Sequence, residues 1–273
     1  MFINLIIIFV ILQFCCLNYF YKRTNFYKNQ FLTAYDFMNE IPYNLKLAVF
    51  GSTYTKFAFN SMKKLRLNAM NFSLDAECLE CDKELLDQYG KHISPGAVVI
   101  FSLSACAACS KMEDVVCLNP MYYYHLLEYK RIPQCLLTIN NHIRYRYPLA
   151  FRLKGIKYLF RDTKEQKDVT DKFPYITDEV VRKEQMSKLV EIWLKMFKLE
   201  NLKDTNIPNE IKLRKKKNTR VLLDLIQFSI DRGYKPALVI LPMSGLLNSF
   251  FSEEFIDITL NKMFRAVQTK YKI

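Results

Sequence analysis

Glycine is scarce in this sequence of 273 residues, and no two of its six glycines are closer than six residues apart. They are Gly51, Gly90, Gly96, Gly155, Gly233 and Gly245. A dinucleotide fingerprint or a Walker loop needs clustered glycines, because the backbone must approach a phosphate closely. This spacing therefore excludes both nucleotide-binding loops. It also excludes a nucleophilic serine flanked by glycines on a strand-to-helix elbow.

Histidine is rarer still, with three residues in the chain: His92, His125 and His142. No two of them stand in a His-x-x-x-His pair, the spacing that places two metal ligands on one face of a helix. The sequence therefore excludes a zincin-type metalloprotease.

Acidic residues are outnumbered, since 27 Asp and Glu against 40 Lys and Arg give a net charge of +13. Such an excess favours anionic partners, namely nucleic acid, acidic lipid headgroups or a polyanionic glycan. The only dense basic run extends from Lys212 to Arg220, and we interpret it as a solvated face or loop. No base-stacking aromatic side chains are interleaved with this run, so nucleic acid is the weakest of these partners.

A long apolar run occupies the amino terminus, from Phe2 to Phe20. As a helix it would be about 28 Å long, close to the thickness of a bilayer core. No small-residue cleavage signal follows it, and aromatic residues at 19–21 suit the headgroup region. We therefore predict an uncleaved transmembrane anchor over 2–21, followed by a juxtamembrane connector over 22–44. The alternative is a buried core helix, although such helices are seldom apolar all round.

Strands and helices alternate in the rest of the chain, and the strands are continuously apolar. This pattern is typical of a parallel sheet covered by helices on both faces. We expect strands at 45–50, 68–74, 97–103 and 237–243, and helices at 54–65, 81–91, 221–232 and 253–270. The sequence therefore predicts one α/β domain over 45–273, interrupted by a mainly helical insertion at about 110–216.

Ser52 follows the first expected strand and precedes its helix. In a doubly wound sheet, ligands bind at the carboxyl ends of the strands, where the loops lead into helices. The free N–H groups at a helix amino terminus can stabilise an oxyanion beside such a serine. Ser52 is therefore a candidate nucleophile, with helix capping as the structural alternative.

Several segments resemble the SGNH (GDSL-like) hydrolase family in their order along the chain. They are Gly51-Ser52-Thr53, NAMNFSL at 68–74, ELLDQYGKHISPGAVVIF at 84–101, MYYYHLLEYKRI at 121–132 and KPALVILPMSGLLNSFFSEEF at 235–255. The resemblance is to the membrane-anchored members associated with bacterial cell-envelope polysaccharides. It implies a three-layer flavodoxin-like fold and O-acyl ester chemistry, either hydrolysis or transfer, on a glycan. It also places Ser52 at the family's nucleophile position.

The sequence departs from this family at the positions of the oxyanion donors and of the general base. Active members offer a glycine after the second strand and an asparagine after the third as oxyanion donors, and neither is evident at 73–76 or 102–105. The family's Asp-x-x-His, whose histidine deprotonates the serine, lies beyond a further strand and is not found here. A serine hydroxyl without a base is a poor nucleophile near neutral pH. We therefore expect a truncated, catalytically impaired esterase or acyltransferase scaffold.

Eight cysteines are a high count for a chain of this length. Two C-x-x-C pairs, Cys78/Cys81 and Cys106/Cys109, each follow an expected strand, so all four thiols are expected at one edge of the sheet. Such pairs can form a four-thiolate zinc site, although the gap between them exceeds the usual range. Ordinary buried thiols are favoured over zinc. Disulfides are the competing interpretation if the body lies outside the cell.

Two further functions remain open besides the SGNH-like one: a non-enzymatic glycan-binding or scaffold protein, and a zinc-stabilised membrane-associated domain. In each, the expected partners are membrane lipid and acidic glycan or other polysaccharide-assembly proteins. The side of the membrane is contested. The resemblance implies a body outside the cytoplasm, whereas Lys22, Arg23 and Lys28 after the apolar run favour a cytosolic one.

Overall fold

The chain divides into two compact units in the computed structural model, which describes residues 2–29, 41–59, 62, 66–163, 178–204 and 206–271. The helical unit joins residues 1–39 to 120–174, and the sheet unit joins 40–119 to 175–273. These bounds differ from those of the expected insertion at 110–216, because residues 175–216 belong with the sheet. Parts of that insertion and of the expected connector at 22–44 lie outside the described residues.

The helical unit consists of short helices and one long apolar helix, α1 (Phe2–Tyr21). Helix α1 contacts the short elements that follow 146, and the Asn18 side-chain oxygen accepts the Leu149 N–H at 3.0 Å. The other elements are α2 (Asn25–Lys28), α7 (Pro120–Leu126), η4 (Tyr129–Arg131), η5 (Gln134–Leu136), α8 (Ile139–Arg146), η6 (Pro148–Ala150), η7 (Leu153–Ile156) and α9 (Lys157–Phe160).

Helix α1 is long and apolar enough to cross a membrane. Its segment Asn4–Tyr21 has a mean hydropathy of 1.9, and only 11% of the segment is buried. A core helix would be mostly buried, so this low burial argues against the core-helix alternative. A signal sequence has the same length and composition as this helix.

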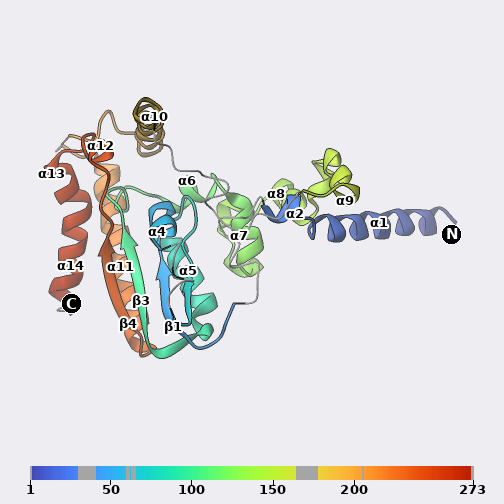
Figure 1. Ribbon diagram of the computed structural model, residues 1–273, viewed down its shortest axis with the longest axis horizontal. Helices are drawn as coiled ribbons and strands as arrows, with labels where there is room; N and C mark the ends of the chain where they lie inside the picture. Colours follow the sequence, from blue (N-terminus) through green and yellow to red (C-terminus); the bar gives the residue numbers. More distant parts are fainter. Residues whose placement is uncertain are drawn as a thin grey trace. The chain divides into compact units, whose positions relative to one another are not determined.

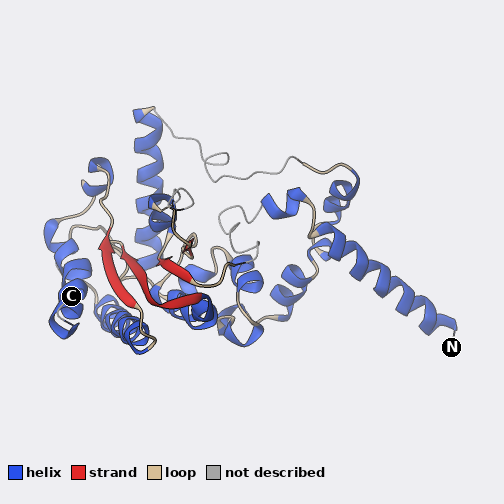
Figure 2. Cartoon of the chain, turned by 60° about the horizontal axis from the view of Figure 1, so that its bottom comes forward, coloured by secondary structure: helices blue, strands red, loops and turns tan. Residues whose placement is uncertain are grey.

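The sheet unit is built on four parallel strands in the order β2-β1-β3-β4. Strands are drawn in red in Figure 2. The strands are β1 (Leu45–Phe50), β2 (Ala69–Asn71), β3 (Ile93–Leu103) and β4 (Lys235–Ile240). The register pairs Val49 of β1 with Ile100 of β3, and Phe101 of β3 with Leu238 of β4. The prediction of a parallel α/β sheet is therefore confirmed, and all four expected strands are present.

The two central strands of the sheet unit differ in burial. Along β3, Val99, Phe101 and Leu103 are buried, whereas Val98, the residue before Val99, is 37% exposed. The Phe50 ring stacks on Phe101 with ring centres 5.8 Å apart. Burial therefore alternates along β3, whereas the consecutive residues Ala48, Val49 and Phe50 of β1, whose side chains alternate between the two faces, are all fully buried.

The helices of the sheet unit follow the strands in the chain, and their labels can be followed in Figure 1. Helix α11 packs against α5, α14 and β4. The helices are α4 (Thr53–Ala58), α5 (Leu79–Tyr89), α6 (Met112–Val116), α10 (Glu179–Phe197), α11 (Asn209–Asp231), α12 (Gly245–Asn248), α13 (Glu253–Ile256) and α14 (Lys262–Tyr271). A 3₁₀ turn, η3 (Gly90–His92), leads into β3.

The sequence predicts the start of helix α13 correctly and misses the start of helix α11. Ser52 and Ser252 both stand before helices, and the Ser252 hydroxyl accepts the Phe255 N–H at 3.1 Å, which confirms the expected cap of α13. Helix α13 continues through a π-helical turn, η9 (Asp257–Asn261), into α14. The expected helix at 221–232 begins earlier, at Asn209, so the basic run is helical rather than a loop.

Candidate functional site

Ser52 lies between β1 and α4, at the carboxyl end of β1. It occupies the N-cap position of α4 with an extended backbone (φ −91°, ψ −165°), yet its side chain makes no capping hydrogen bond. The Ser52 hydroxyl therefore does not cap helix α4, as the structural alternative had it. Ser52 instead contributes to the lining of a pocket.

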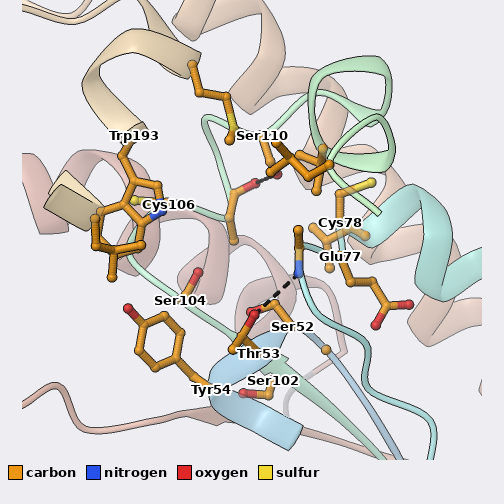
Figure 3. Close-up of a pocket in the computed structure, with 18 of the residues that line it drawn as sticks. Ser52, Thr53, Tyr54, Glu77, Cys78, Ser102, Ser104, Cys106, Ser110 and Trp193 are labelled. Carbon is orange, nitrogen blue, oxygen red and sulfur yellow. Dashed lines mark hydrogen bonds between the residues drawn. The ribbon is translucent and has the colours of Figure 1, made fainter. Parts of the chain in front are cut away.

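The pocket at Ser52 has a volume of about 420 Å³ and is lined entirely by the sheet unit (Figure 3). Five residues of the lining carry hydroxyl groups: Ser52, Thr53, Ser102, Ser104 and Ser110. Much of the remaining lining is apolar and comes from Phe57, Leu118, Met186, Leu189, Ile192, Trp193, Met196 and Phe197. Figure 3 shows Trp193 opposite Glu77 and Cys78. The arrangement suits a small ligand with one apolar part and one polar part.

Helix α11 holds the loop that follows β3 in place. The Asn218 side-chain amide is buried and donates to the carbonyl oxygens of Ala107, Ala108 and Ser110 at 3.0, 3.1 and 2.8 Å. One turn earlier, Arg214 Nη1 donates to the Cys109 carbonyl at 3.2 Å. Because Ala107 and Ser110 line the pocket, these hydrogen bonds fix the shape of its wall.

Replacing Asn218 by alanine is expected to lower the free energy of unfolding by about 2 kcal/mol, because buried carbonyl oxygens lose their donor. Denaturant titration of the full chain measures this change. Asn209→Ala is the matched control, since Asn209 is exposed at the start of the same helix and should change stability little. Equal stability of the two variants would contradict the role assigned to Asn218.

The loop after β2 uses its backbone donors internally. The N–H groups of Ser73 and Leu74 donate to Asn71 Oδ1 at 3.1 Å and to Glu77 Oε2 at 2.7 Å. The Ala76 N–H donates to Thr53 Oγ1 at 3.3 Å, the bond drawn between these elements in Figure 3. These three N–H groups therefore already have acceptors within the protein. They lie in the loop in which active members of the SGNH family, which the sequence resembles, carry an oxyanion donor.

The histidines lie in three different settings. His92 is the single histidine of the sheet unit and directly precedes β3, where Ile93 pairs with Leu45 at the start of β1. Since Ser52 follows the far end of β1, His92 lies at the opposite edge of the sheet. Its ring stacks on Tyr43, with ring centres 4.3 Å apart.

The other two histidines belong to the helical unit and have aromatic partners there. His125 Nε2 lies 2.6 Å from the Tyr27 hydroxyl, and burial followed by the charge of Lys22 lowers the pKa of His125 to about 4. His142 makes edge-on ring contacts with Tyr124 and Tyr129. Each therefore has a packing role within its own unit.

Two buried carboxyl groups in the pocket lining were missed by the sequence reasoning. Glu77 and Asp82 hydrogen-bond to each other, and Asp82 also accepts the Gly51 N–H. Among the described residues, Glu77 Oε1 and Asp82 Oδ1 have no conventional donor, so a shared proton between the carboxyls satisfies both. The pair thus connects the turn before Ser52 to the loop after β2.

Burial determines the protonation of this pair. It raises the pKa of Glu77 well above its usual range, and the neighbouring Asp82 raises it further. Burial also raises the pKa of Asp82 to about 7, while hydrogen bonds from Glu77 and the Gly51 N–H oppose the shift. The pair therefore retains a proton at neutral pH.

The four C-x-x-C thiols do not form a metal site. Cys106 and Cys109 lie in an apolar cluster with Phe197, Phe251 and Phe255. Burial raises the pKa of Cys106 well above its usual value and that of Cys109 to about 12, so both are thiols in this cluster. Across the described ranges, no group of three or more His, Cys, Asp or Glu side chains is arranged to hold a metal ion. The zinc alternative therefore receives no support there.

Nothing matches this chain in comparisons with family models, curated proteins or solved structures.

Proposed function

We propose that this chain is a membrane-anchored protein of cell-envelope polysaccharide metabolism with SGNH-hydrolase-like architecture, which binds the O-acyl group of a glycan ester at Ser52. The proposal depends on one observation: Ser52 follows the carboxyl end of a parallel strand, makes no capping hydrogen bond and lines a largely apolar pocket. The strand order β2-β1-β3-β4 agrees with the flavodoxin-like order and supports the three-layer arrangement as part of this proposal.

The pocket favours binding over hydrolysis. The apolar lining from α10 suits a short acyl chain, and the serine hydroxyls suit the ester and sugar oxygens. The sheet unit's single histidine is at the wrong edge of the sheet for a general base, and the N–H groups after β2 are engaged. These two facts also support the second candidate, a glycan-binding scaffold without turnover.

We propose that α1 anchors the chain in the membrane, with the body outside the cytoplasm as in the family it resembles. The positive residues after α1 argue for the other side. The net positive charge of the chain suits acidic headgroups or an acidic glycan in either orientation.

Trp193 gives a direct measure of binding, because it is the only tryptophan of the chain and lines the pocket. Titration with an O-acetylated oligosaccharide is expected to change its fluorescence, whereas the de-O-acetylated oligosaccharide should leave it unchanged. Leu189→Arg is expected to weaken binding about tenfold or more, because a charge replaces part of the apolar lining. Val181→Arg is the control, since Val181 is exposed on the same helix and outside the pocket lining. Equal responses to both oligosaccharides would contradict the proposed ligand.

Turnover of aryl acetates by the purified chain is expected to stay near the uncatalysed rate and to be the same in Ser52→Ala. Ser52→Ala should weaken binding of the O-acetylated oligosaccharide less than Leu189→Arg does, because it removes one hydroxyl group while the apolar lining stays intact. Turnover that Ser52→Ala abolishes would show instead that Ser52 is an activated nucleophile with a base, and the chain would then be an enzyme.

A further inference from the structure

Two thiols meet at the start of α5. Cys78 is the N-cap residue of this helix, and its Sγ lies 3.3 Å from Sγ of Cys81 one turn later. A disulfide needs about 2.0 Å between the sulfurs, so a small rotation of the side chains brings these two into bonding distance. We propose that Cys78 and Cys81 form a redox-active dithiol, which a small disulfide compound converts reversibly into an intramolecular disulfide at the pocket wall.

The surroundings of Cys78 suit an attacking sulfur. Cys78 occupies the N-cap position of an 11-residue helix, and its side chain makes no capping hydrogen bond. Lys217 pairs with Glu80 at 2.5 Å and interacts electrostatically with Cys78. The Cys81 thiol is within hydrogen-bonding distance of the same sulfur.

Access to the two sulfurs is unequal and sets the order of events. Cys78 contributes to the pocket lining, whereas Cys81 is 1% exposed. The Cys78 thiolate attacks one sulfur of the small disulfide, which forms a mixed disulfide and releases one thiolate. Cys81 then gives up its proton and attacks the Cys78 sulfur, which releases the second thiolate. The protein loses two electrons and two protons, and the small disulfide gains them as two thiols.

The second C-x-x-C pair provides an internal contrast. Cys106 and Cys109 have the same spacing, but they lie in an apolar cluster within a loop rather than at the start of a helix. Burial holds both of these thiols in the protonated form. Because the thiolate is the reactive species, this pair should not exchange with the small disulfide.

The test uses the full chain equilibrated in mixtures of mercaptoethanol and hydroxyethyl disulfide, then acid-quenched, denatured, alkylated and analysed by peptide mass spectrometry. In the oxidising mixtures we expect the loss of two alkylation sites, at Cys78 and Cys81, with a mass lower by two hydrogens in the peptide that contains both. Reduction should restore both sites, while Cys106 and Cys109 remain alkylated throughout.

Variants separate this pair from the rest of the chain. Cys106→Ser with Cys109→Ser should leave the oxidation unchanged, whereas Cys81→Ser should stop it at the mixed disulfide on Cys78. Full alkylation of Cys78 and Cys81 in every mixture would overturn the proposal, as would oxidation of both C-x-x-C pairs to the same extent. The wild-type measurement decides the matter even if a variant does not fold, and it is independent of any ligand in the pocket.

Discussion

Asp82→Asn is expected to reduce the fall in stability that the wild-type chain undergoes between about pH 4 and pH 7, and the titration of Glu77, whose pKa burial also raises, accounts for the fall that remains. Burial raises the pKa of Asp82 from 3.8 to about 7. Within this window the folded chain therefore holds a proton that the unfolded chain has released, so the free energy of unfolding decreases as the pH rises. One pKa unit corresponds to about 1.4 kcal/mol, so the decrease from Asp82 is on the order of 4 kcal/mol.

The asparagine amide can replace the shared proton. Its NH₂ group donates to Glu77, and its oxygen still accepts the Gly51 N–H, so the contacts at 51 and 77 are retained without titration at 82. Denaturant titrations at pH 4.5, 6 and 7.5 under reducing conditions measure the slope of stability against pH. Asp87→Asn is the control, because Asp87 is partly exposed on the same helix. A variant at 82 that keeps the wild-type slope would show that Asp82 does not hold a proton in this pH range.

The strands were predictable because their signal is local. LKLAVF and AVVIFSL are short apolar runs bounded by turn residues, and the structure places both in the centre of the sheet. The start of α11 was not predictable in this way, because a run of Lys and Arg has the composition of a solvated loop. Its first turns are helical since Ile211, Arg214 and Asn218 recur on one face, where they bury against the loop after β3.

The candidate site was predictable only in part. Ser52 was placed by one rule, that loops at the carboxyl ends of parallel strands meet. The pairing of Glu77 with Asp82 depends on burial, which the local sequence Glu-Cys-Leu-Glu-Cys-Asp does not reveal, because acidic residues at the start of a helix are ordinary. Likewise, the contribution of α10 to the pocket joins residues far apart in the chain. Tertiary contacts of this kind leave no periodic signal.

Gly51→Ala is expected to lower the free energy of unfolding by about 3 to 5 kcal/mol, since it combines backbone strain with overpacking. Gly51 has φ +143°, a conformation that alanine rarely adopts. A Cβ at this position would overlap Thr55 Oγ1 and lie 3.2 Å from Ser102 Cβ. Thr55 is 1% exposed and has little space to move. Because Ser102 lines the pocket, the response of Trp193 to an acyl ester should also decrease.

Gly245→Ala is the matched control, because a Cβ there meets no heavy atom within 4 Å. It should change stability by less than about 1 kcal/mol, the usual scale of an unstrained glycine replacement. Thr55→Ala introduced together with Gly51→Ala should recover part of the lost stability, since it removes the overlapped oxygen. The strain at φ +143° and the 3.2 Å approach to Ser102 would persist, so recovery should be incomplete. If Gly51→Ala alone unfolded at the wild-type denaturant concentration, the close packing of the turn before Ser52 would be disproved.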